Sequence, residues 1–162
     1  MIWKSIDEND AGIRSEGGRL VANLIKTLHR VNASALAEYL IELGGVTLLI
    51  QIITGYVLTS EASQARIHSE SAVQFSELSS SRGQVFPIVQ NEGIIALILL
   101  YSLSPKCLDR ILEYTEPLLV AINCLLDTAS LEQNSQKTIE NITFMNICQL
   151  MLILSRNDGK HV

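Results

Sequence analysis

The spacing of apolar residues predicts helices along most of this chain. Between residues 17 and 31, apolar side chains recur every three or four positions, which is the period of an amphipathic helix. Three later stretches, 46–53, 94–103 and 147–154, are almost purely apolar. A helix that crosses a bilayer needs about 20 apolar residues. Runs of this length therefore predict helices buried in a protein core, and no insertion into a membrane is expected.

Three segments repeat the same order of features: residues 32–55, 80–104 and 134–156. Each begins with asparagine or serine, continues with a short amphipathic helix, breaks, and ends with one of the apolar helices. A unit of this kind cannot cover its apolar helix alone, whereas stacked neighbours can. We therefore expect the apolar helix of the middle segment to be buried between its two equivalents.

The predicted breaks fall at Gly44-Gly45, at Gly93 and near Asn141-Ile142. Two helices that meet at a sharp angle need a residue with positive φ. Glycine adopts that conformation without a steric penalty, and asparagine adopts it less readily. The pattern therefore predicts two clear corners and a weaker third one.

Longer helices are expected to connect the repeated units. The segment 60–80 is compatible with a helix but polar, with only a narrow apolar stripe. Ser104-Pro105 should end the preceding apolar helix, because proline cannot continue it. Beyond this point the chain predicts two helices, or one helix kinked at Pro117, with Thr115 as the N-cap.

Four segments resemble the repeats of the armadillo family: LIELGGVTLLIQII (40–53), SAVQFSELSSS (71–81), VQNEGIIALILLYSLSP (89–105) and LVAINCLLDTAS (119–130). The resemblance implies an all-α fold, a right-handed α-solenoid or armadillo-like superhelix of about two and a half to three repeats. The repeat spacing of about 49 residues exceeds the family's usual period. The expected organisation is a single domain over residues 1–162, with a cap or flexible lead at 1–16, repeats at 17–31 (partial), 32–80, 81–130 and 131–156 (partial), and a tail at 157–162.

In the armadillo family the third helices line a concave groove that binds extended or helical peptides, so the resemblance implies a groove here. The matching positions are Asn23, Thr27, Val73, Glu77, Val120 and Cys124. Members similar to importin-alpha hold a basic peptide with paired tryptophan and asparagine side chains, and these positions carry no such pair. The implied groove is therefore more apolar, with acidic side chains at Glu77 and Asp127.

Composition and charge narrow the class of protein further. The chain is 48% apolar and only 5% aromatic, with a net charge of −5, which favours a core of packed aliphatic helices. No cluster of lysine and arginine is present in the sequence, so binding to nucleic acid is not expected. The three cysteines are odd in number and widely spaced. They indicate buried free thiols in a reducing compartment, the cytoplasm or the nucleus.

No combination of residues predicts catalysis, a metal or a cofactor. The three histidines, His29, His68 and His161, lack the paired spacing of metal ligands. Cys124 lies among apolar residues without a nearby base, so we interpret it as a small buried side chain. The run at 79–82 is either a polar connector or a phosphorylation site. The sequence therefore predicts a protein that is not an enzyme.

Two functions are compatible with these patterns. The first is a non-enzymatic scaffold or adaptor that binds a helix or an extended peptide of a protein partner in the groove. The alternative is a structural subunit that self-associates, or docks end to end into a larger helical assembly, through apolar ends near residues 2–13 and 147–154. Trp3 lies at the first of these ends, where it either caps the stack or docks a partner.

Overall fold

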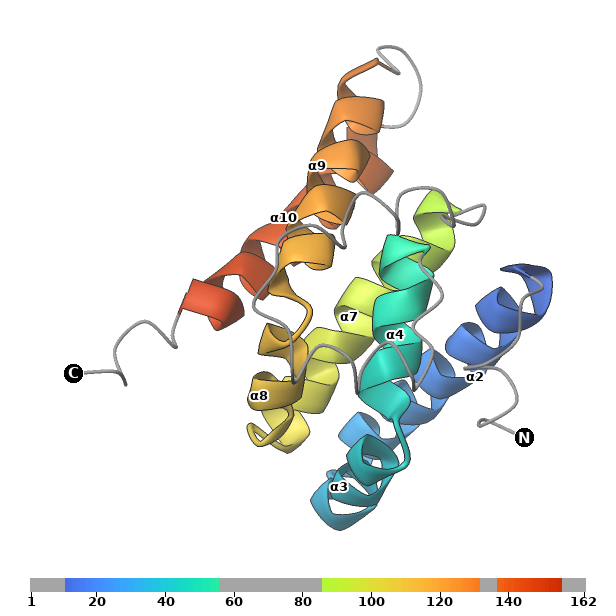
Figure 1. Ribbon diagram of the computed structural model, residues 1–162, viewed down its shortest axis with the longest axis vertical. Coiled ribbons are helices and arrows are strands. Elements are labelled where there is room, and N and C mark those ends of the chain that lie inside the picture. Colours follow the sequence, from blue (N-terminus) through green and yellow to red (C-terminus); the bar gives the residue numbers. More distant parts are fainter. Residues whose placement is uncertain (1–10, 56–85, 132–136, 156–162) are drawn as a thin grey trace, which may run out of the picture.

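The computed structural model describes residues 11–55, 86–131 and 137–155, and the elements in these ranges are all α-helices (Figure 1). In chain order they are α2 (Ala11–Arg30), α3 (Ser34–Glu42), α4 (Gly45–Thr54), α7 (Pro87–Leu103), α8 (Cys107–Leu112), α9 (Thr115–Leu131) and α10 (Lys137–Ser155). The predicted all-α class is confirmed for these ranges. The predictions for residues 1–10, for the polar helix at 60–80 and for the tail at 157–162 lie outside them.

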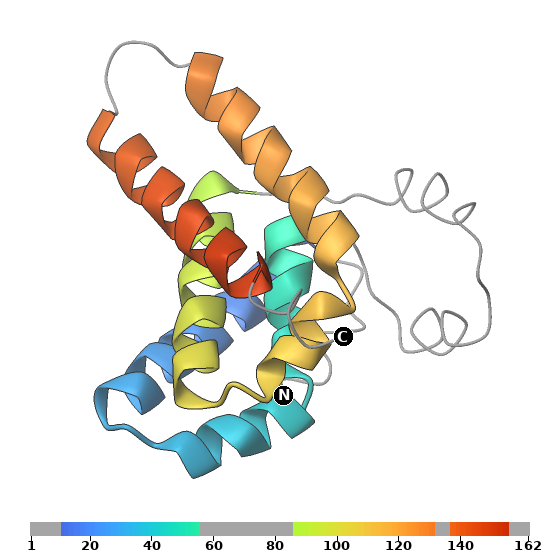
Figure 2. The same cartoon turned by 90° about the vertical axis from the view of Figure 1, so that its left-hand side faces the viewer.

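α7 is the central helix of the packed part of the molecule. It packs against both α4 and α10, so the middle apolar helix lies between its two equivalents, as expected. It also packs along α2, a contact that the repeat pattern did not predict. Both views show α2 and α3 toward one end of the molecule and α9 and α10 toward the other (Figure 1, Figure 2).

α3 and α4 form the helix pair with the sharpest predicted corner. Gly44 has a φ of 82° and precedes α4, and the two helices are bent by 71°. The corner at Gly44 is therefore confirmed, and every residue of α4 except Thr47 is buried. Among the described residues, no single helix is long and apolar enough to span a membrane. The bent pair α3 and α4 passes that test when its two helices are taken together.

The predicted break at Gly93 is wrong, because Gly93 lies inside the continuous helix α7. Glycine is required at position 93 for a different physical reason, which is the close approach of α4. A Cβ atom at this position would lie 2.8 Å from Ile53 Cγ1 and 3.1 Å from Ile52, which is closer than packed carbon atoms tolerate. A Cβ atom on Gly18 of α2 would overlap Ile52 from another direction. Both glycines thus let a helix approach α4 closely.

The predicted break near Asn141 is also wrong, since α10 runs without interruption from Lys137 to Ser155. Nothing in this stretch forces a break, because it contains neither glycine nor proline.

Helix α2 begins at Ala11, six positions before the start that the sequence predicts.

The connections after α7 follow one of the two expected alternatives. α7 ends at Leu103, with Ser104 as its C-cap, and two separate helices follow, with Pro117 in the first turn of the second one. Thr115 is the first residue of α9, and its hydroxyl donates a hydrogen bond to the Leu112 carbonyl at 2.9 Å. This bond joins the end of α8 to the start of α9.

Polar side chains link the helices at a few defined points. Gln90 of α7 donates from Nε2 to the Ile53 carbonyl at 2.6 Å, which satisfies a carbonyl near the C-terminus of α4 that has no partner within its own helix. Asn146 of α10 donates to Asn91 Oδ1 of α7 at 2.9 Å. Because Gln90 is buried, its bond fixes the position of α7 along α4.

Candidate interaction surface

The described residues contain no group of three or more histidine, cysteine, aspartate or glutamate side chains that could hold a metal ion. His29 is exposed in the last turn of α2. His68 and His161 lie outside the described ranges.

The three cysteines differ in exposure: Cys107 is buried, Cys124 is half-buried and Cys148 is exposed. The prediction of buried thiols is therefore wrong for Cys148, because Ile147 and Leu150 occupy the core side of α10. Burial raises the pKa of the Cys107 thiol to about 12, since desolvation disfavours the thiolate.

We expect the three thiols to react at very different rates with an aromatic disulfide reagent at about pH 8, because only an accessible thiolate attacks. Cys148 should react in a fast phase, and Cys107 should react only on unfolding. Absorbance of the released thiolate measures both phases. Cys148→Ser should abolish the fast phase, whereas Cys107→Ala should leave it unchanged. A fast phase that persists in Cys148→Ser would contradict this assignment.

The structure places the predicted groove residues on two different helices. Asn23 and Thr27 are exposed on α2, where the Thr27 hydroxyl donates to the Asn23 carbonyl at 3.0 Å. Val120 is exposed on α9, and Cys124 is half-buried there.

These two pairs do not share a surface. α2 and α9 lie toward opposite ends of the molecule, with α4 and α7 between them (Figure 1, Figure 2). Val73 and Glu77, which the resemblance placed in the same groove, lie outside the described residues.

The outer side of α9 combines apolar and acidic side chains. Val120 is 43% exposed and shares this side with Glu116, Asn123 and Asp127, which are also exposed. The predicted acidic residue Asp127 therefore lies on the same helix face as Val120. This face is mixed in character.

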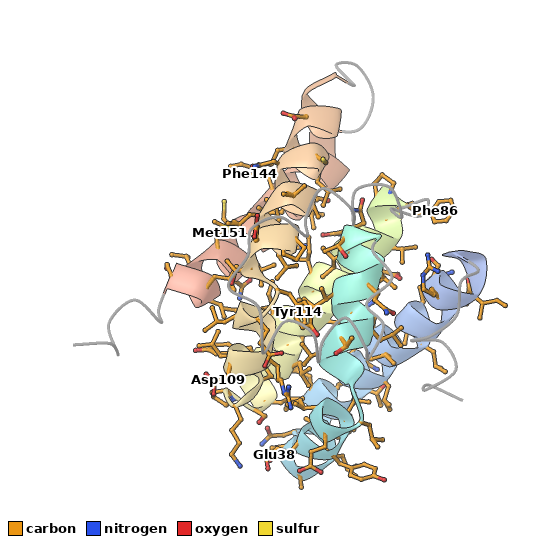
Figure 3. All side chains as sticks on the ribbon, in the orientation of Figure 1. Glu38, Phe86, Asp109, Tyr114, Phe144 and Met151 are labelled. Atoms are coloured by element: carbon orange, nitrogen blue, oxygen red, sulfur yellow. The ribbon has the colours of Figure 1, made fainter. Side chains whose placement is uncertain are left out.

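The outer side of α10 is mostly apolar, and we refer to it as the α10 face. Its apolar members are Ile142, Phe144, Met145, Cys148, Met151 and Leu152, all of which are exposed. The uncharged polar residue Gln149 is exposed on the same side. Residues 142–155 include no charged side chain. Figure 3 shows Phe144 and Met151 on the side of the α9–α10 pair that is turned away from α2 and α4.

The α10 face arises because this helix has more apolar sides than the rest of the described fold covers. Ile147, Leu150, Ile153 and Leu154 are buried by packing against α7 and α9. The residues between them point away and stay exposed. α10 carries two apolar stripes, one on its buried side and one on its exposed side. In the sequence they form one continuous apolar run, and such a run predicts a helix that is buried on all sides.

Comparison with protein-family models, curated proteins and solved structures finds no match to this chain.

Proposed function

We propose that this chain is a non-enzymatic, armadillo-like helical module that binds a helix of a partner protein through the α10 face. The observation that carries the proposal is the exposure of large apolar side chains on one helix: Met145 is 69% exposed and Leu152 is 62% exposed. Apolar side chains gathered on one surface mark sites of interaction with other molecules.

The spacing of the α10 face favours a helix as its ligand. Exposed apolar residues recur at positions 144–145, 148 and 151–152. Side chains spaced three or four residues apart form ridges along the surface of a helix. The ridges of a second helix fit into the grooves between such rows. Because residues 142–155 carry no charge, the partner helix should present apolar side chains to them.

The proposed armadillo-like stack rests on two observations. The α3–α4 pair has the expected short helix, the glycine corner and the buried helix. The helices α4, α7 and α10 pack side by side in that order, as stacked repeats do. An exposed free thiol at Cys148 is compatible with the reducing cytoplasm or nucleus, where we place the protein.

A photo-crosslinking amino acid at position 145 tests this function in the source cell. We expect it to form adducts with a partner, and the cross-linked peptides should map to an apolar helix face. The same amino acid at position 120 tests the groove of the resemblance, and position 109, on the exposed surface of α8, serves as the control.

The substitution Leu152→Glu should lower adduct formation at position 145 by about tenfold, because a carboxylate would have to be buried in the contact. The circular dichroism spectrum should stay unchanged, since Leu152 is exposed. Adducts that form at position 120 but not at 145 would move the binding site to α9. Adducts only with a second copy of this chain would replace partner binding by self-association.

A further inference from the structure

The outer side of α2 carries a second exposed apolar surface, which we name the α2 stripe. Its apolar side chains are Ile13, Leu20, Leu24 and Val31, all of which are exposed. The half-buried Gly17 and the exposed Thr27 lie between them. Leu20 is 55% exposed and Val31 is 66% exposed. Val31 follows the last residue of α2, but its amide still donates to the Thr27 carbonyl at 3.2 Å, so it keeps the helical spacing.

The spacing of the α2 stripe is that of a two-helix seam. Successive members lie four, three, four, three and four residues apart, which is the alternation that packs two helices side by side. The stripe also reads the same from both ends, because Leu20 and Leu24 flank its midpoint at Ala22. In an antiparallel pair of α2 helices, the facing positions would be Leu20 and Leu24, Gly17 and Thr27, and Ile13 and Val31.

The polar residues beside the stripe have the same symmetry. Glu16, Asn23 and Arg30 lie along one flank, and all three are exposed. In an antiparallel pair, Glu16 of one copy lies beside Arg30 of the other, and Asn23 lies beside its own equivalent. A parallel pair would instead place this flank beside Val21 and Leu28 of the partner, so the pairing of Glu16 with Arg30 would be lost.

Two other cations of α2 form ion pairs within the chain. Arg19 and Lys26 lie 3.3 and 4.0 Å from the Glu92 carboxylate of α7, and Arg19 also pairs with Glu16 at 3.3 Å. Arg30 is thus the exposed cation on the same flank as Glu16.

We propose that the occupant of the α2 stripe is a second copy of this chain, paired antiparallel about a twofold axis near Ala22. A twofold interface requires a surface that is complementary to itself, and both the apolar order and the charge order of α2 meet this requirement. A surface that binds a different protein does not need an apolar order or a charge order that is complementary to itself. The helix is about 30 Å long, so the contact is modest in size and the dimer should dissociate at micromolar concentrations.

Sedimentation equilibrium of the full chain at increasing concentration tests the proposal first. We expect a reversible monomer–dimer equilibrium, and Leu20→Glu should abolish it because two carboxylates would meet apolar side chains at the centre of the seam. Leu152→Glu, on the α10 face, is the matched control and should leave the dissociation constant unchanged. A monomer at all concentrations, or a dimer insensitive to Leu20→Glu, would overturn the proposal and assign the stripe to another occupant.

A charge exchange tests the antiparallel arrangement. Glu16→Lys alone and Arg30→Glu alone should each weaken the dimer by about tenfold, since both flanks then carry like charges. An equimolar mixture of the two single variants should dimerise again, because the lysine introduced at position 16 of one chain then faces the glutamate introduced at position 30 of the other. General damage to α2 would not be repaired by mixing, so two variants that remain monomeric together would overturn the antiparallel pairing.

Discussion

Replacing Gly18 with alanine should lower the free energy of unfolding by about 1–3 kcal/mol. The added methyl group would overlap Ile52 of α4, and α4 is enclosed by α2, α7 and α9. It therefore cannot move away from α2 without disturbing α7, whose Gly93 touches the same region of α4. Chemical denaturation followed by circular dichroism measures the loss.

The matched control is Gly12→Ala, which lies on the same helix but is exposed. This change should be neutral or slightly stabilising, because alanine is the better helix former. Ile52→Ala adds a second check. Combined with Gly18→Ala, it should cost less than the sum of the two single changes, since it removes the overlapping atoms. Equal effects of Gly18→Ala and Gly12→Ala would show that α2 does not lie this close to α4.

Leu97→Ala should be more damaging still, with a loss of about 2–5 kcal/mol. Leu97 is fully buried in α7, the helix that α2, α4 and α10 all contact. Truncation leaves a cavity that these neighbours cannot fill together, because each one is fixed by its own packing. Denaturant unfolding at one fixed protein concentration gives the difference from the wild-type chain.

Leu152→Ala provides the comparison for this second prediction. It deletes the same atoms from an apolar helix but at an exposed position, so stability should change by less than about 0.5 kcal/mol. The two variants thus compare the stability lost at a buried position of an apolar helix with the stability lost at an exposed one. Comparable losses at both positions would mean that residue 152 is covered within the protein.

Gly44 and Gly93 show how far a sequence can predict this fold. Both glycines precede an apolar run, and the pattern predicts a corner at each. Gly44 has the positive φ of a corner, whereas Gly93 lies inside a continuous helix against Ile53. The requirement for no Cβ atom is the same in the two cases. The cause differs. At Gly44 it is the positive φ of the local backbone, and at Gly93 it is the close contact with a helix that is distant in sequence.

The same limit applies to the candidate surfaces. Apolar periodicity predicted the packing of α7 between α4 and α10, since these helices need partners on several sides. It could not show that α2 also packs on α7, because α2 lies outside the three repeated segments and its apolar stripe does not specify which helix covers it. Nor could it show that Met145 and Cys148 stay exposed while Ile147 and Leu150 are buried. Which apolar side of a helix is covered depends on how many neighbours reach it.

The enclosure of α4 also has a consequence for the order in which the chain folds. During synthesis α4 leaves the ribosome well before α7, whose Gly93 closes over Ile53. Until α7 arrives, α4 can pack against α2, but its sides that later face α7 and α9 stay uncovered. The early part of the chain must therefore wait for a later part to complete its core. Nascent chains at this stage are the ones that chaperones would need to protect.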